Sequence, residues 1–210
     1  MPMRRAVKYG LIALLLAGSI SISIGFNLSF NFGASRSTVT STTNVYDYRD
    51  HPGLRQHHLS NLDRSRTRIE IVKSKFELYL YQDDSWVATF PCVFGGDPIS
   101  DKRMEGDMAT PEGIFHVNEV RTHDLWTRFI GIDYPTATST LRFNDLQRRG
   151  EIPADATIGG EIGIHGVQGG HEEWISQHYN WTLGCISLRT EDIITLANAV
   201  QIGTEVKILH

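Results

Sequence analysis

The sequence is poor in cysteine and proline, with two and seven of them among 210 residues. Two cysteines allow one disulfide at most, which excludes a small scaffold held together by disulfides. Neither sign of charge dominates, because 20 Lys and Arg face 24 Asp and Glu and leave a net charge of −4. Hydrophobic residues make up 40% and charged residues 21% of the chain, which excludes wholesale disorder. A chain of this length has room for one domain and short additional segments.

The charges are unevenly distributed along the chain. Residues 1–65 carry seven Lys or Arg and three Asp or Glu, a net +4, whereas residues 66–210 carry thirteen and twenty-one, a net −8. A protein that binds nucleic acid needs a concentrated basic face to contact phosphates. The acidic body therefore argues against a nucleic-acid partner and favours a small enzyme or binding module on a basic-flanked tether.

The first 35 residues have the pattern of an export signal. Three basic residues within the first eight precede an uncharged run from Tyr9 to Ser35, whose most apolar part is residues 11–17. A basic start followed by an apolar core is typical of such signals. Residues 1–35 are either a cleaved signal peptide or a retained anchor helix, which needs about 20 apolar residues. Both alternatives predict an exported protein of the cell envelope, on the periplasmic side of the cytoplasmic membrane. A retained anchor would hold the N-terminus in that membrane, whereas a cleaved signal peptide would release the domain.

Residues 36–66 predict a flexible linker. They are rich in Ser, Thr, Asn, Arg and His and contain few apolar residues. Such a composition buries too little apolar surface to hold a fold of its own. We therefore expect a tether and linker over residues 1–66 and a single folded domain over residues 67–210.

Alternation of apolar and polar residues predicts a mainly β domain. The alternation runs through residues 69–80 and resumes over residues 86–92 after a polar turn, which is typical of a hairpin or meander. Further short strands are expected at residues 114–117, 162–164 and 204–209.

One helix is clear from the sequence, and a second is expected to be short. Thr190 is expected to cap a helix whose apolar positions follow helical spacing and which ends before Gly203. A short helix is expected over residues 141–149. The remainder of residues 121–160 is expected to be irregular.

The candidate catalytic residues are a histidine and a cysteine near the C-terminal end of the chain. His165 is followed by Gly166, and Cys185 comes twenty residues after the histidine. The cysteine lies within the sequence Trp181-Thr182-Leu183-Gly184-Cys185-Ile186-Ser187-Leu188. A cysteine attacks a carbonyl as the thiolate, so it needs a base nearby, and histidine serves near neutral pH. Gly184 has no Cβ, which lets a substrate carbonyl approach the backbone. The N–H groups of Leu183, Gly184 and Cys185 are expected to point at a developing oxyanion.

Two other interpretations compete for these residues. Cys185 and Cys92 would form a disulfide, as is usual for two cysteines in an exported protein, although Cys92 continues a core-facing alternation and suits a small buried side chain. Alternatively His165, His171, His178 and Cys185 would bind zinc. Their spacings of six, seven and seven match no familiar ligand pattern.

Four ordered motifs make residues 68–209 resemble a YkuD-type L,D-transpeptidase domain. The family shows a glycine-ended strand, a G-D-x-x-T-P-x-G loop, His-Gly followed by Ser/Thr-x-Gly-Cys, and a closing helix and strand. The matching residues are Phe94-Gly95-Gly96, residues 106–113, His165-Gly166 with Thr182-Leu183-Gly184-Cys185-Ile186, and Gly203-Thr204-Glu205-Val206. The resemblance implies a mainly β fold, a β-sandwich of mixed sheets with one or two short helices, preceded by the N-terminal apolar helix.

The resemblance also implies a reaction. Cys185 would be the nucleophile on a peptidoglycan stem peptide, attacking the carbonyl of a diamino acid that precedes D-alanine. His165 would accept and return the proton, and Thr182 would orient the imidazole. The thioester would be resolved by an amine from another stem or from a protein, giving a cross-link or wall attachment. No metal and no organic cofactor is implied, and carbapenems are expected to acylate the cysteine.

This sequence departs from the family pattern around the cysteine. Leu183 stands where many members have His, and Ser187 stands where many have Arg, with Arg189 two residues further on. These changes bear on how the substrate carboxylate is held, and the candidate substrate-binding residues are Gly166, Trp181, Ser187 and Arg189. The stretch between His165 and Cys185 is longer than usual, and it forms either a lid or a local aromatic cluster with Trp174, Tyr179 and Trp181.

Two further functions remain open from the sequence. If water resolves the thioester, the same site is an L,D-carboxypeptidase or amidase. If the two cysteines pair, the domain is a wall-binding module without catalysis.

Overall fold

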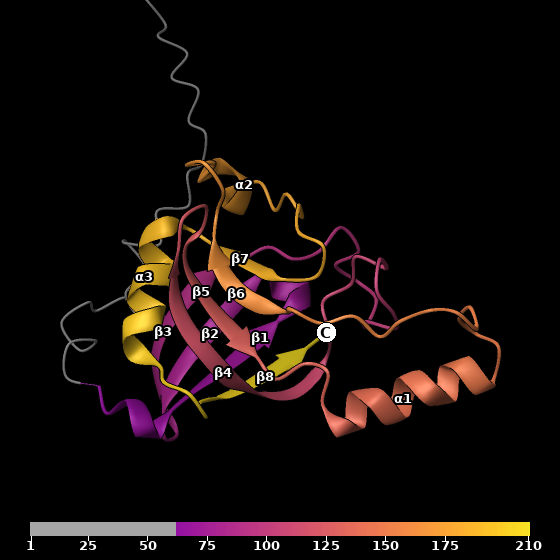
Figure 1. The fold of residues 1–210 in the computed structure, drawn as a ribbon. Coiled ribbons are helices and arrows are strands. Elements are labelled where there is room, and N and C mark those ends of the chain that lie inside the picture. The colour runs from indigo at the N-terminus through magenta and orange to yellow at the C-terminus, as the bar shows by residue number, and fades with distance from the viewer. Residues whose placement is uncertain (1–61) are drawn as a thin grey trace, which may run out of the picture. The chain divides into compact units, whose positions relative to one another are not determined.

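A computed structural model of the chain describes residues 62–210 (Figure 1). The predicted signal or anchor, residues 1–35, and residues 36–61 of the predicted linker lie outside the described residues. Within residues 62–210 no helix has both the length and the apolar character needed to cross a membrane.

Eight strands form one mixed sheet in the order β3-β2-β1-β8-β4-β5-β6-β7. The pairs β1–β8 and β6–β7 are parallel, and the other neighbours are antiparallel. The strands are β1 (Thr67–Val72), β2 (Glu77–Gln82), β3 (Ser85–Pro91), β4 (Gly113–His123), β5 (Thr127–Ile132), β6 (Gly163–Gly166), β7 (Ile186–Leu188) and β8 (Glu205–Leu209). The expected mainly β fold is confirmed. Strand β4 pairs with β8 through its first residues and with β5 through its later ones, so the two halves of the sheet are continuous.

The described helices are short. They are α1 (Ala137–Arg148), α2 (Glu173–Ser176) and α3 (Thr190–Ala199), with single 3-10 turns at Arg64–Arg66 and Lys73–Lys75. Helix α3 packs against β5 and β6 at the left of the view in Figure 1, whereas α1 lies at the lower right, beyond the strands. The apolar positions of α3 are buried, with Ile193 and Leu196 fully enclosed, because they share one helical face. Helix α3 therefore fixes the strands that carry the candidate site.

The expected hairpin is confirmed, and its alternation marks the core. Strand β2 pairs with β1 and β3, and Ile69, Ile71, Leu78 and Leu80 are all inaccessible to solvent. Cys92 is also fully buried, as its place in the alternation predicts.

Three details differ from the sequence-based expectations. Strand β5 lies within the stretch expected to be irregular. Helix α1 begins at Ala137 because Thr136 caps it, its Oγ1 accepting the Ser139 N–H at 3.1 Å. Helix α3 begins at Thr190 itself, so Arg189 and not Thr190 is the capping residue. The Thr190 N–H donates to the carboxylate of Glu172 at 3.2 Å, so a side chain from the His165–Cys185 stretch supplies the missing cap.

Candidate active site

The register of β6 and β7 puts His165 and Cys185 on one face of the sheet. The two strands are parallel, and Ile164 is paired with Ile186. Cys185 directly precedes Ile186, so the same register sets it beside Gly163. Side chains two residues apart on a strand point to the same face. His165 and Cys185 are therefore diagonal neighbours across adjacent strands.

A side-chain-bonded turn presents the cysteine. The Thr182 hydroxyl donates to the Cys185 carbonyl at 2.7 Å and accepts the Gly184 N–H at 3.2 Å, which is a serine/threonine turn. The Thr182 carbonyl accepts the Gly96 N–H at 3.1 Å. These contacts correct the expectation that Thr182 orients His165, because Thr182 shapes the cysteine turn instead. They also leave the Gly184 N–H engaged with Thr182, so it is not an oxyanion donor in this arrangement.

Glycine is required at Gly184 for packing and backbone conformation. Its φ is +141°, which side-chain-bearing residues rarely adopt, and a Cβ there would lie 2.9 Å from the Ala109 carbonyl oxygen. At Gly95 a Cβ would lie only 2.0 Å from the Met108 carbonyl oxygen. The glycine-ended strand and the G-D-x-x-T-P-x-G loop therefore press directly against the cysteine turn. Gly184 was expected to let a substrate carbonyl approach, and its contact with the Ala109 carbonyl was not predictable from the motif.

The Cys185 thiol is a half-buried group that stays protonated at neutral pH. Its Sγ donates to the Glu161 carbonyl oxygen at 3.5 Å. Burial raises the pKa of this thiol above its usual value, and the negative charge of Glu161 adds to the rise. The Gly163 backbone N–H and the positive charge of Lys102 act in the opposite direction and lower the pKa.

Lys102 lies near the site, although no motif of the sequence predicted it. It is buried, and its Nζ donates to Asp107 at 2.9 Å and to the Met104 carbonyl at 3.1 Å. The Asp107 carboxylate also accepts the Ala109 N–H at 3.0 Å. This ion pair therefore fixes the loop that touches Gly184 and brings a positive charge near the cysteine sulfur. The only available signal was a lysine shortly before the Gly106-Asp107 motif.

The imidazole of His165 is enclosed by aromatic rings. Its side chain is 2% exposed, and its ring centroid lies 4.3 Å from that of Trp126 in a stacked contact. Trp181 meets it edge-on at 5.5 Å, and Phe129 lies 6.4 Å away. Burial lowers the pKa of His165 to about 4, and the nearby His123 adds to the decrease. The ring is therefore neutral at neutral pH.

The neutral ring has one defined tautomer. His165 Nδ1 lies 2.9 Å from the Gly166 carbonyl oxygen. A carbonyl oxygen only accepts hydrogen bonds, so Nδ1 carries the proton and Nε2 keeps a lone pair. The imidazole is thereby prepared to accept a proton at Nε2.

The candidate substrate-binding residues differ in exposure. Ser187 is inaccessible to solvent, so the expectation that it contacts substrate is corrected. Gly166 is buried as well, and a Cβ on it would lie 2.6 Å from the Trp126 carbonyl oxygen, so its role is to admit the Trp126 loop. Trp181 and Arg189 are partly exposed. Leu183, beside the cysteine turn, is 78% exposed.

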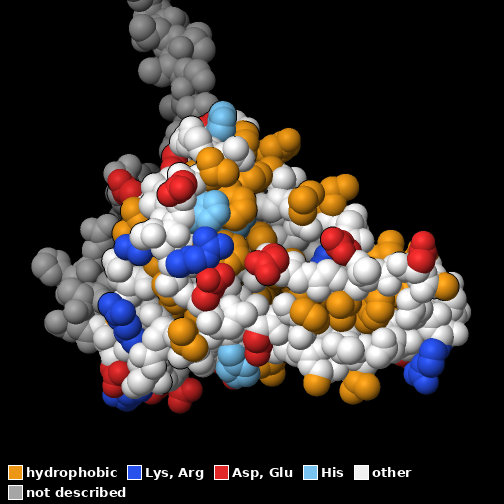
Figure 2. Space-filling model, viewed as in Figure 1, with side chains coloured by type: hydrophobic (Ala, Val, Ile, Leu, Met, Phe, Trp, Pro, Cys, Tyr) orange, Lys and Arg blue, Asp and Glu red, His pale blue; other side chains and the backbone are white. Residues whose placement is uncertain are grey.

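The long stretch between His165 and Cys185 is folded on its own aromatic residues. Trp174 contacts His171, Tyr179 and Trp181, with centroid distances of 4.2, 5.5 and 5.3 Å. Figure 2 shows hydrophobic side chains gathered over α2 and the chain beside it. Of the two expected arrangements, a lid or a local aromatic cluster, the structure has the aromatic cluster. The Glu172 carboxylate connects this stretch to α3 by accepting the Thr190 N–H.

The two competing interpretations of the histidines and cysteines disagree with the geometry. Both cysteines lie in the described part of the chain and both are free, so the expected alternative of a Cys92–Cys185 disulfide is corrected. His171 stacks on Trp174, and His178 stacks on Phe76. Across residues 62–210 no three His, Cys, Asp or Glu side chains gather as a set of metal ligands.

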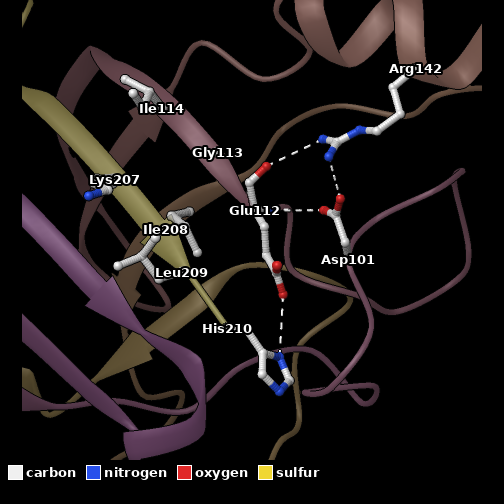
Figure 3. A pocket seen from close by; sticks show the side chains of 9 residues that line it. All are labelled: Asp101, Glu112, Gly113, Ile114, Arg142, Lys207, Ile208, Leu209 and His210. Atoms are coloured by element: carbon white, nitrogen blue, oxygen red, sulfur yellow. Dashed lines mark hydrogen bonds and ion pairs between the residues drawn. The ribbon is translucent and has the colours of Figure 1, made fainter.

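A separate pocket of about 300 Å³ lies where β8 ends and β4 begins (Figure 3). In this pocket the Asp101 carboxylate accepts the Glu112 N–H at 2.8 Å and pairs with the Arg142 guanidinium. The Nζ atom of the buried Lys73 forms an ion pair with Glu112 Oε1 at 2.9 Å. The pocket is lined by Asp101, Glu112, Gly113, Ile114, Arg142, Lys207, Ile208, Leu209 and His210. Neither His165 nor Cys185 belongs to it.

Comparisons with solved structures find similar folds at low sequence identity. Bd1075 from Bdellovibrio bacteriovorus is 19% identical with a TM-score of 0.48, and the match covers 69% of this chain and 48% of that one. An L,D-transpeptidase from Mycobacterium smegmatis is 10% identical with a TM-score of 0.47, covering 69% and 59%. The helical cell shape determining protein Pgp2 from Campylobacter jejuni is 21% identical with a TM-score of 0.47, covering 68% and 46%. The chain thus spans about half the length of these structures.

A comparison with curated proteins gave no match. The comparison with protein families matches residues 66–208 to YkuD, the L,D-transpeptidase catalytic domain. The matched range contains all eight strands except the last residue of β8, together with His165 and Cys185. The chain therefore belongs to the YkuD family of L,D-transpeptidase catalytic domains.

Proposed function

We propose that this protein catalyses L,D-transpeptidation of peptidoglycan stem peptides, with Cys185 as nucleophile and His165 as general base. The observation that carries the proposal is the parallel register of β6 and β7, because it sets Cys185, the residue before β7, diagonally across from His165. The hydrogen bond from Nδ1 to Gly166 leaves Nε2 as the proton acceptor.

The first half of the reaction forms a thioester. As the Cys185 sulfur attacks the carbonyl carbon of the diamino acid, the thiol proton passes to Nε2 of His165. The bond from that carbonyl to the D-alanine nitrogen then breaks. D-alanine leaves as an amine, with the proton returned by His165.

The second half resolves the thioester. An amine of a second stem peptide attacks the same carbonyl carbon and gives up a proton to His165. The carbon–sulfur bond breaks, and the sulfur takes that proton back. The product is a new amide, a cross-link between two stems, and the enzyme returns to its starting state. An amine on a protein would give attachment of that protein to the wall by the same step.

The electrostatics favour proton transfer in step with attack. A raised thiol pKa and a His165 pKa of about 4 mean that both groups are neutral before substrate arrives. A separated thiolate and imidazolium would be costly in this buried site. The Gly163 N–H and the Lys102 charge are the groups that stabilise the sulfur as negative charge develops on it.

The proposal includes a location. Residues 1–35 would export the domain and hold it at the outer side of the cytoplasmic membrane, and residues 36–66 would act as the tether. Peptidoglycan stem peptides are found on that side, which is consistent with the proposed substrate. Protease accessibility of the full chain in intact cells and in spheroplasts tests this location, and protection in both would contradict it.

The reaction is tested by incubating the full chain with purified muropeptides that carry tetrapeptide stems and analysing products by mass spectrometry. We expect a covalent acyl-enzyme and cross-linked dimers with the wild type, and neither with Cys185→Ala. His165→Ala should lose turnover, whereas Cys92→Ala, which removes the buried thiol, should retain it. An acyl-enzyme that persists in Cys185→Ala would overturn the assignment of the nucleophile. Shortened monomers without dimers would contradict transfer and assign a carboxypeptidase.

A further inference from the structure

The stretch between His165 and Cys185 carries exposed aromatic rings that the proposed reaction does not use. Tyr179 is 54% exposed, and Trp174 is partly exposed. Figure 2 shows hydrophobic side chains gathered over α2, the helix that contains Trp174. Single exposed apolar side chains are common on proteins, whereas a contiguous group of them is typical of a binding surface.

These rings form a chain of contacts that ends at the candidate base. Trp181 meets the imidazole of His165 edge-on, with ring centroids 5.5 Å apart. Trp174 lies 5.3 Å from Trp181, and Tyr179 lies 5.5 Å from Trp174. Tyr179 is therefore three ring contacts away from His165, and a ligand bound on the outer rings would lie close to the reacting groups.

Only the inner end of this chain is part of a hydrophobic core. Trp181 packs against a small core cluster of Val93, Val167 and Ile175. Trp174 and Tyr179 belong to neither core cluster of the described residues. Their rings therefore contribute little to the interior, and they leave apolar surface exposed to solvent near the active site.

The charge around these rings favours a neutral ligand. His171, which stacks on Trp174 with centroids 4.2 Å apart, is paired with the Glu173 carboxylate at 3.0 Å. Among the described residues no Lys or Arg side chain stacks on a ring of this cluster. The net charge of −8 on the acidic body disfavours an anionic lipid surface. A neutral ligand with flat apolar faces and a polar edge therefore fits these rings best.

We propose that Trp174 and Tyr179 form a stacking site for the pyranose ring of a neutral N-acetylated amino sugar, the sugar that carries the stem peptide attacked by Cys185. The inference rests on the proposed function and adds a carbohydrate site to it. A pyranose ring presents C–H groups on its faces and hydroxyl and acetamido groups at its edge. Aromatic rings therefore cover its faces, while its edge stays in contact with water.

The size of the substrate agrees with this placement. The two or three stem residues between the sugar and the attacked carbonyl span roughly 7–10 Å when extended. Trp174 and Tyr179 are two and three ring contacts away from His165, and each contact is between 5.3 and 5.5 Å. A sugar on these rings can therefore remain attached to a stem whose carbonyl lies at Cys185.

The first test measures carbohydrate binding and needs no turnover. The full chain, labelled with nitrogen-15, is titrated with chitotetraose, a neutral oligosaccharide of N-acetylglucosamine that carries no peptide. The chain contains four tryptophans, whose indole N–H resonances report on them separately. We expect a saturable shift of the Trp174 resonance and no shift of the Trp86 resonance, although Trp86 is 44% exposed. Equal shifts of both resonances, or none at Trp174, would overturn the inference.

Variants of Tyr179 separate stacking from folding. Tyr179→Ala removes the ring and should weaken chitotetraose binding by about threefold to tenfold, whereas Tyr179→Phe keeps the ring and should bind nearly as the wild type does. The matched control is Tyr81→Ala, which removes a partly exposed tyrosine of β2 whose ring lies under Arg68. It should leave the affinity unchanged. An equal loss in Tyr179→Ala and Tyr81→Ala, or no loss in Tyr179→Ala, contradicts the site.

The same resonance distinguishes a sugar from a lipid. Dihexanoyl phosphatidylglycerol, added as a monomer below its micelle concentration, should leave the Trp174 resonance unchanged, because its charge has the same sign as that of the acidic body. A saturable shift with this lipid and none with chitotetraose would identify the rings as a lipid-binding surface and overturn the inference.

The last test separates this inference from the proposed reaction. Tetrapeptide stems are prepared with the disaccharide attached and with an acetyl group in its place, and acylation of Cys185 is followed by intact mass. We expect the wild type to favour the sugar-bearing donor by about threefold to tenfold in kcat/KM, and Tyr179→Ala to lose that preference. If neither donor acylates the wild type, the proposed function fails, while the chitotetraose titration still decides the role of the rings. If both donors acylate equally, the sugar site is wrong and the reaction stands.

Discussion

The imidazole of His165 lies on the indole of Trp126, with ring centroids 4.3 Å apart and an interplanar angle of 21°. Trp126 belongs to the turn between β4 and β5, and its carbonyl accepts the Gly166 N–H at 3.1 Å. A second ring, that of His123, stacks on Trp126 at 4.2 Å. The turn between β4 and β5 contains no residue of the family motifs. It nevertheless covers the His165 imidazole and limits its exposure to solvent. Because burial is the main cause of the low pKa, this turn also sets the protonation state of the candidate base.

Replacing Trp126 by alanine should raise the pKa of His165. Loss of the indole admits water to one face of the ring and removes much of the burial that holds the pKa at about 4. We expect the pKa to move toward about 6.5, the value of an exposed histidine. Titration of the imidazole C–H resonances by NMR measures the change directly.

The matched control for this experiment is His123→Ala. It removes the outer ring and a small charge effect but leaves Trp126 in place, so the pKa of His165 should rise much less. Equal shifts in the two variants would show that charge and not burial lowers the pKa.

The pH dependence of Cys185 reactivity should be that of a thiol with a raised pKa and no imidazolium beside it. His165 is neutral above about pH 4, so no imidazolium is present to stabilise a thiolate at neutral pH. We expect the rate of alkylation by iodoacetamide to rise with a single inflection above about 8.5, the usual thiol pKa. Stopped labelling between pH 5 and 10 gives the profile.

Lys102→Met supplies the comparison for this profile. It removes a charge that lowers the thiol pKa, so alkylation at pH 8 should slow further while the inflection moves to higher pH. An inflection below pH 7 in the wild type would reveal a thiolate–imidazolium pair and contradict the neutral starting state.

The sequence allowed prediction of most elements that carry a repeating pattern. The hairpin of β2 and β3 and the helix α3 show alternation or helical spacing, because each buries one face. Strand β5 does not, since residues 129–132 are all buried and no polar face interrupts them. With β5 unrecognised, the turn that carries Trp126 could not be connected with His165.

The motif around Cys185 could be identified in the sequence, but the burial of its residues and their neighbours in the fold could not be predicted. The order of His165 and Cys185 identified the candidate pair, but exposure depends on which distant segments cover them. Val93 and Ser187 exchange backbone hydrogen bonds at 3.0 and 2.8 Å, although they are far apart in sequence. This bridge buries Ser187, and spacing within the motif contains no information about it. The same holds for Lys102, whose proximity to the sulfur results from loop packing.

Gly184→Ala should destabilise the domain and reduce activity. The new Cβ would meet the Ala109 carbonyl oxygen at 2.9 Å, and a φ of +141° is unfavourable for alanine. We expect a loss of about 1–3 kcal/mol in the free energy of unfolding. Urea denaturation followed by circular dichroism measures it. Gly160→Ala, where a Cβ meets nothing within 4 Å, is the control and should change stability little; equal losses in the two variants would contradict the packing argument.

Ser187→Ala should preserve activity and raise stability. The Ser187 side chain is inaccessible to solvent, and its Oγ has no hydrogen-bond partner among the described residues. Burying a hydroxyl without a hydrogen-bond partner destabilises the folded state, because the lost contact with water is not replaced. Alanine has no hydroxyl to bury, so we expect the free energy of unfolding to rise by about 1 kcal/mol. The same variant tests the earlier expectation that Ser187 holds substrate, because KM for the muropeptide should stay unchanged. Denaturant unfolding and steady-state kinetics on one preparation provide both readouts. A raised KM with unchanged stability would mean that Ser187 becomes accessible when substrate binds, and would restore it to the substrate site.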